Sequence, residues 1–216
     1  MAATVHADRA AHGHAHGGGH GQDAHGHHDH HDLEGLKTFG FWLFLITDVI
    51  LFATLFATYV VLRNNTAGGP TAAELFSLPI VIAETFILLT SSFTSGLAVL
   101  SMHQGRLRGL IGWLVVTALL GASFIGLEVY EFLHLVHEGA TMQTSAFLSA
   151  FFTLVGAHGA HVSLGLVWMI ALIFQLSRRG ITPVTERKVN VISLYWHFLD
   201  VVWIFVFTVV YLMGVM

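Results

Sequence analysis

Residues 191–215 read VISLYWHFLDVVWIFVFTVVYLMGV, a nearly unbroken apolar run that contains one acidic residue, Asp200. A helix that crosses the roughly 30 Å of membrane hydrocarbon needs about 20 mostly apolar residues. This run is long enough to span a bilayer. Its length is typical of a membrane helix and not of a strand or a short core helix.

Four comparable apolar runs precede it, over residues 39–62, 79–102, 110–133 and 147–176. Short turn-rich or basic segments separate the runs, and connections of that length favour antiparallel neighbours. Hydrophobic residues make up 55% of the 216 residues and charged residues only 10%, which is not the composition of a soluble domain. We therefore predict an all-α fold: a polytopic membrane protein whose residues 37–216 form a bundle of five transmembrane helices.

Residues 1–36 differ sharply in composition, since His, Gly, Ala and Asp dominate them. So few apolar groups cannot offset the entropy lost on ordering, and we predict a disordered tail. The tail lacks the pattern of a cleavable signal peptide, so we expect the first apolar run to remain in the mature protein. Its histidines could bind zinc, copper or nickel without fixed geometry, or the tail could be a solvated spacer; both readings stay open.

The basic residues predict how the chain is oriented in the membrane. With a cytoplasmic N-terminus, all Lys and Arg residues except Arg63 fall on the cytoplasmic side, as the positive-inside rule requires. The C-terminus then faces the periplasm.

Two features that the sequence lacks exclude several classes of function. The chain has no cysteine, which excludes disulfides, thiolate zinc sites and iron–sulfur clusters. It also has no basic stripe that would bind phosphates, so we expect no nucleic-acid partner.

Ionisable side chains inside the predicted spans are the candidate functional residues. Such groups are costly in hydrocarbon unless they are paired or hydrated. Glu128 and Glu131 lie three residues apart, as do His158 and His161, so each pair shares one helical face, which we expect to point inward. The full set is Asp48, Glu84, Glu128, Glu131, His158, His161, His197 and Asp200.

Two readings of this set are open. Imidazoles with carboxylates behind them could hold a metal or a haem. Alternatively, Glu–His hydrogen bonds could fix the register of the helices in lipid. A haem with two axial imidazoles needs them on opposite sides of the ring, and only one span carries a His pair. We expect no catalytic, cofactor-binding or metal-binding residue here, and we interpret the eight residues as a structural polar network or lipid contacts.

Individual members of the set allow narrower expectations. His197 could pair with Asp200, which lies about one helical turn further along the chain. Asp48 could carry protons, as isolated carboxylates in pumps do, or could have a structural or lipid-headgroup role.

The order of motifs carries a resemblance to a known family. Tyr195-Trp-His-Phe-Leu-Asp-Val-Val-Trp203 resembles the final-helix signature of subunit III of the haem–copper respiratory oxidases. His158-Gly-Ala-His161-Val and Glu128-Val-Tyr-Glu131-Phe resemble the motifs of the two preceding helices. Phe44-Leu-Ile-Thr-Asp48 is similar to the span in which many members carry a membrane-embedded carboxylate, although many cytochrome c oxidase relatives have Glu where this chain has Asp. Five spans match the shorter bacterial form, and further details are similar to its cytochrome o ubiquinol oxidase branch.

The resemblance implies an accessory role. Such a subunit is a non-catalytic part of a proton-pumping terminal oxidase of the bacterial inner membrane, in which ubiquinol is oxidised and oxygen is reduced to water. It carries no haem or copper, because these belong to the catalytic subunit I, against which it packs. Subunits II and IV complete the assembly. The subunit holds phospholipid and supports assembly and stability.

A metal-ion transporter with a His-rich cytosolic tail is the alternative from a different class. Transporters of that kind bring carboxylates and imidazoles from two helices together at mid-depth, often four residues apart. The three-residue spacings in this chain do not supply that arrangement.

Overall fold

The computed structural model describes residues 23–66 and 78–215, all of whose regular structure is helical. Five of its helices are long and apolar enough to cross a membrane, over Phe39–Leu62, Leu78–His103, Leu107–His137, Ala146–Arg179 and Pro183–Leu212. The prediction of five spanning helices is therefore confirmed. The chain divides into two units, Met1–Leu43 and Phe44–Met216, and all packing contacts given below lie in the second unit.

The first helix, α1 (Asp23–Leu62), starts earlier than predicted. Residues 23–36, which we expected to belong to a disordered tail, are helical, while residues 1–22 lie outside the described part of the chain. No proline interrupts residues 23–62. Extending an existing helix fixes one residue for each new hydrogen bond, so the helix of the first span can continue upstream of its apolar run.

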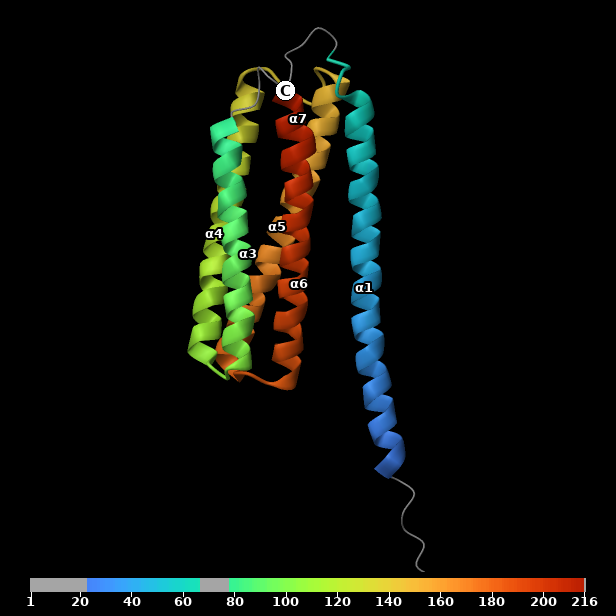
Figure 1. The fold of residues 1–216 in the computed structure, drawn as a ribbon, viewed down its shortest axis with the longest axis vertical. Helices are drawn as coiled ribbons and strands as arrows, with labels where there is room; N and C mark the ends of the chain where they lie inside the picture. Colours follow the sequence, from blue (N-terminus) through green and yellow to red (C-terminus); the bar gives the residue numbers. More distant parts are fainter. Residues whose placement is uncertain (1–22, 67–77, 216) are drawn as a thin grey trace, which may run out of the picture. The chain divides into compact units, whose positions relative to one another are not determined.

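Four further helices pack around one core: α3 (Leu78–His103), α4 (Leu107–His137), α5 (Ala146–Arg179) and α6 (Pro183–Val206). Figure 1 shows these four running side by side, with successive helices in opposite directions. The neighbouring pairs are α3 with α4, α4 with α5, α5 with α6, and α3 with α6. The short connections impose this arrangement, since three residues separate α3 from α4 and three separate α5 from α6.

Capping residues set the helix ends more sharply than the apolar runs do. Ser145 accepts a hydrogen bond from the Leu148 backbone N–H at the start of α5, and Gly180 ends that helix with φ of +68°. Thr182 and Thr185 form a reciprocal capping box at the start of α6, with Pro183 in the first turn. The fifth span consequently begins at Pro183 and not at Val191, because its first turns are polar but well capped.

The end of the fifth span departs from α-helical geometry. Residues Phe207–Leu212 form a π-helical segment, η1, which is followed by the short helix α7 (Met213–Val215). The Tyr59 hydroxyl of α1 donates to the Val210 carbonyl at 3.4 Å, and Tyr211 is fully buried. The wider turn thus places a tyrosine in the core and turns a carbonyl toward α1. π-Helical turns of this kind are frequent at functional sites.

Candidate functional site

Asp48 and His161 meet between α1 and α5. The Asp48 Oδ1 atom lies 3.7 Å from Nε2 of His161, and the other ring nitrogen is 2.7 Å from the Ala157 carbonyl. Tyr195 of α6 donates its hydroxyl to the His161 carbonyl at 3.2 Å. A carbonyl on one side and a carboxylate on the other hold this imidazole in one orientation. The pair joins the first span to the rest of the bundle.

Three glutamates converge between α3 and α4. Glu84 is fully buried, and Glu128 and Glu131 are 4% and 6% exposed, so the predicted inward direction of the α4 pair is confirmed. Glu84 lies within electrostatic range of both. The Tyr211 hydroxyl donates to Oε2 of Glu131 at 3.3 Å, which brings η1 into the same cluster. We call Glu84, Glu128, Glu131 and Tyr211 the glutamate cluster.

Gly159 of α5 has no side chain, and this leaves room for the carboxyl group of Glu128. A Cβ atom at Gly159 would lie 2.4 Å and 2.5 Å from the two carboxyl oxygens of Glu128. The Glu128 carboxyl group therefore rests directly on the α5 backbone. Gly159 follows His158 in the HGAH motif, so the motif supplies both an imidazole and the space for a neighbouring helix's carboxyl group.

His158 is fully buried among aromatic rings. Its ring centroid lies 5.2 Å from that of Trp203, 5.9 Å from Phe124 and 6.4 Å from Phe52. Neither ring nitrogen has a hydrogen-bond partner among the described residues. The ring centroid of Phe52 also lies 5.1 Å from that of His161, so this one phenyl ring packs against both imidazoles.

The structure therefore corrects the Glu–His network that the sequence suggested. The imidazole that contacts a carboxylate is His161, and its partner is Asp48, from a different span. No Glu–His hydrogen bond within the spans is found in the described part of the chain. The three-residue spacing correctly placed Glu128 and Glu131 on one inward face, but it held no information about which helix faces which.

The remaining two candidates lie apart from each other. His197 is exposed, and its Nδ1 atom is 2.7 Å from the Ser193 carbonyl one turn earlier. Asp200 is 8% exposed and lies beside Ser92 of α3 without completing a hydrogen bond of normal geometry. The suggested His197–Asp200 pair is thus not formed in the described structure.

The sequence analysis did not predict the hydrogen bonds that two tryptophans make between α6 and α3. Trp196 and Trp203 of α6 donate their indole N–H groups to Ser91 and Thr85 of α3, at 2.9 Å and 3.0 Å. Each tryptophan is 1% exposed and therefore packs inside the bundle. The sequence offered only a weak signal for these bonds, the many hydroxyl residues along α3.

The described residues include no group of three His, Cys, Asp or Glu side chains that could hold a metal ion. The two histidines of the HGAH motif diverge, one toward Asp48 and one into the aromatic cage. The site holds buried acids, an aromatic cage and tyrosine hydroxyls, which suit tight helix packing in a low-dielectric interior.

Comparison with known proteins agrees with this picture. Residues 20–215 match the family described as cytochrome c oxidase subunit III. The chain is 59% identical over 196 residues to cytochrome bo(3) ubiquinol oxidase subunit 3 of Pseudomonas aeruginosa, covering 89% of this chain and 94% of that protein. It is 56% identical over 179 residues to quinol oxidase subunit 3 of Bacillus spizizenii, covering 83% and 88%. It is 54% identical over 183 residues to cytochrome c oxidase subunit 3 of Bacillus sp. strain PS3, covering 84% and 88%.

Proposed function

This chain belongs to the cytochrome c oxidase subunit III family, and we propose that it is the accessory subunit III of a proton-pumping haem–copper quinol oxidase. The observation that carries the proposal is the high identity, over nearly the whole length, to subunits named for ubiquinol and quinol oxidases. Relatives named for cytochrome c oxidases are nearly as similar, at 54% identity.

The role that fits the buried residues is to hold the bundle in one arrangement. The Asp48–His161 pair ties α1 to α5, the Glu131–Tyr211 hydrogen bond joins α4 to η1, and tryptophan hydrogen bonds join α6 to α3. In lipid, helices gain little from apolar contact alone, so packing and interhelical hydrogen bonds determine which helices associate. A rigid bundle of this kind gives a catalytic subunit a stable surface on which to assemble.

The orientation in the membrane follows from the distribution of Lys and Arg residues, and the partner subunits and the place of the cofactors follow from the family. The N-terminus lies in the cytoplasm and the C-terminus in the periplasm of a bacterial inner membrane. Oxidase subunit I packs directly against this chain, and subunits II and IV belong to the same complex. Haem and copper reside in the catalytic subunit and not in this one. Phospholipid is the one ligand that we assign to this chain.

A metal transporter gains no support from the structure or from the relatives. Its defining feature would be a shared coordination site of imidazoles and carboxylates, and the described residues do not form one.

Deleting the chain from the native membrane tests the proposal. We expect oxygen uptake driven by ubiquinol to fall, while oxygen uptake driven by reduced cytochrome c stays unchanged. Loss of the cytochrome c activity alone would assign the subunit to the other branch of the family. Normal activity with both donors, at unchanged amounts of haem protein, would overturn the accessory role.

A further inference from the structure

The π-helical segment η1 is the part of the fifth span that decides where Tyr211 points. A π turn closes its hydrogen bonds five residues apart and not four, so it holds more residues than an α turn. An α-helix rotates by about 100° per residue, so one extra residue changes which side chains beyond it face the core. If η1 closed to an α-helix, Tyr211 would rotate by about that angle and leave its buried position.

The π form of η1 gives Tyr211 a fully enclosed site with a hydrogen-bond acceptor. Its ring centroid lies 6.0 Å from that of Phe151 and 6.3 Å from that of Trp203. Its hydroxyl donates to Oε2 of Glu131 at 3.3 Å. The other carboxyl oxygen of Glu131 has no partner among the described residues. The Tyr211 hydroxyl is therefore the donor on which this buried carboxyl group depends.

A tyrosine of the first span contacts η1 from another helix. Tyr59 lies three residues before the end of α1, and its hydroxyl donates to the Val210 carbonyl at 3.4 Å. Where a π segment returns to α-helical spacing, the change from five-residue to four-residue bonds skips one backbone carbonyl. Val210 lies in this last turn of η1. A buried carbonyl rarely lacks a donor, and the Tyr59 hydroxyl supplies one that an unbroken α-helix would not need.

Tyr59 reaches η1 from a position that α5 helps to hold. Its ring is 1% exposed, with its centroid 6.1 Å from that of Phe147 in the first turn of α5. The Phe147 backbone N–H donates to the Asn65 carbonyl just beyond α1, at 3.3 Å. A pocket of about 330 Å³ lies beside these rings, and Met213 and Gly214 also line it. The residues that follow η1 therefore have space in which to move.

We propose that Tyr59 and η1 form a conformational latch, in which the Tyr59 hydroxyl holds η1 in its π form and this form keeps Tyr211 on Glu131. The bond between Tyr211 and Glu131 then forms only when the first span is docked against η1. The inference goes beyond the proposed function, because every contact in it lies within this chain. The latch couples two parts of the fold, since a displaced first span leaves a buried carboxyl group without its donor, which is costly in lipid.

A double-mutant cycle in the detergent-purified complex tests the latch. Tyr59→Phe and Tyr211→Phe each remove one hydroxyl and leave the ring in place. The midpoint temperature at which this chain unfolds is measured for the unchanged complex, for each variant and for the pair. Because Tyr59 acts through Tyr211, the double variant should lose less than the sum of the two single losses. Additive losses would overturn the proposal.

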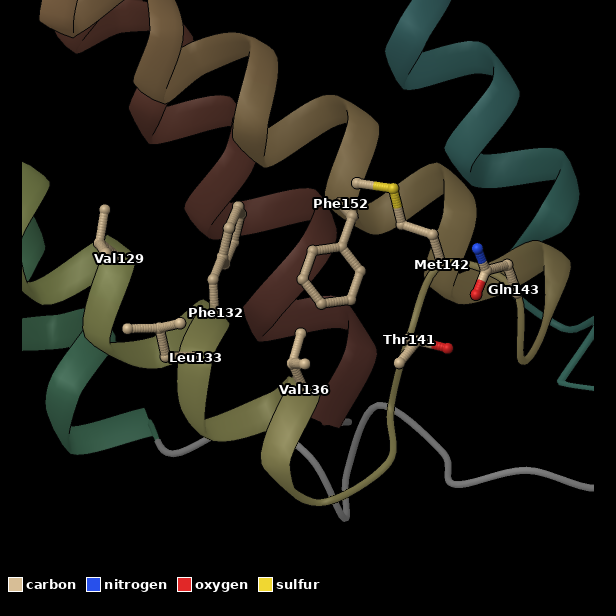
Figure 2. Close-up of a pocket in the computed structure, with 8 residues that line it drawn as sticks. All are labelled: Val129, Phe132, Leu133, Val136, Thr141, Met142, Gln143 and Phe152. Carbon is tan, nitrogen blue, oxygen red and sulfur yellow. The ribbon is translucent and has the colours of Figure 1, made fainter.

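Two control variants separate the latch from a general loosening of the bundle. Tyr195→Phe removes another hydroxyl that donates to a backbone carbonyl, that of His161 at 3.2 Å, and its loss should add to that of Tyr211→Phe. Phe152→Leu weakens the packing of α5 against α4, where Figure 2 shows the ring of Phe152 beside that of Phe132, and its loss should add to that of Tyr59→Phe. Sums that fall short in the controls as well would overturn the proposal.

A vibrational spectrum detects the latch without unfolding the chain. The ultraviolet resonance Raman bands of tyrosine report whether its hydroxyl donates a hydrogen bond. Subtracting the spectrum of Tyr211→Phe from that of the unchanged complex isolates Tyr211, and the same subtraction is made with Tyr59→Phe present in both samples. We expect Tyr211 to lose its donated hydrogen bond in the Tyr59→Phe complex well below the unfolding midpoint. An unchanged Tyr211 spectrum would show that η1 holds its π form without Tyr59 and would overturn the latch.

Discussion

Gly121 of α4 lies directly against the ring of Trp196 of α6. A Cβ atom at Gly121 would lie 2.7 Å and 2.8 Å from two ring carbons of Trp196, well inside the contact distance of about 3.5–4.0 Å between carbon atoms. Trp196 is 1% exposed and its indole N–H is bound to Ser91 at 2.9 Å. The ring therefore cannot turn away without breaking that bond or displacing its neighbours.

The variant Gly121→Ala should destabilise the bundle by a net free energy of about 0.5–4 kcal/mol. Overpacking a buried contact costs roughly 1–3 kcal/mol, and weakening the Trp196–Ser91 hydrogen bond adds about 0.5–1.5 kcal/mol. Alanine in place of glycine inside a helix recovers only about 0.5–1 kcal/mol. Gly126→Ala on the same helix is the control, since a Cβ atom there meets open space and should be neutral or stabilising.

The assay is the midpoint temperature at which the subunit is lost from the purified complex, together with the yield of assembled complex. We expect Gly121→Ala to lower both relative to Gly126→Ala. The added change Trp196→Phe should remove the clash, so its cost should be smaller in the Gly121→Ala background than in the unchanged chain. Equal midpoints for the two alanine variants would refute the close packing of α4 against Trp196.

Three further predictions concern the polar residues and the tail. Tyr211→Phe should lower the stability of the bundle by about 1–3 kcal/mol, because the buried Glu131 carboxyl group loses a donor; thermal dissociation of the complex measures this, and an unchanged midpoint would contradict it. His161→Leu leaves the buried Asp48 unpaired, so it should reduce the recovery of assembled complex more than the turnover of the complex that does assemble. Normal assembly with lost turnover would point to a direct role in proton transfer. Deletion of residues 1–22, which leaves α1 whole, should leave quinol-driven oxygen uptake intact with and without added zinc, and a zinc-dependent defect would refute the spacer reading of the tail.

Hydropathy was sufficient to predict the number and approximate position of the spans. The length of hydrocarbon that a helix must cross fixes how many apolar residues it needs, so the five runs were unambiguous. The predicted ends of the helices were less accurate, because capping residues determine where a helix begins and ends. The fifth span starts eight residues before the apolar run at Val191, where Thr182 and Thr185 cap the helix.

The partners of the buried residues were beyond sequence reasoning. Spacing along one helix showed correctly that Glu128 and Glu131 share an inward face. It could not show that His161 faces Asp48 on another span, since the rotation of each helix about its axis is decided by packing. The π-helical turn that delivers Tyr211 to the glutamates also had no sequence signal, because it adds one residue to a turn without changing the apolar pattern.

Purification of a tagged copy of this chain from its native membrane in mild detergent tests the central claim most directly, with an optical spectrum and mass spectrometry of the proteins that accompany it. The account predicts a stoichiometric complex in which larger subunits carry all of the haem, quinol drives oxygen reduction, and the chain alone shows no haem absorbance. A colourless protein without oxidase partners, or haem bound to the isolated chain, would contradict it.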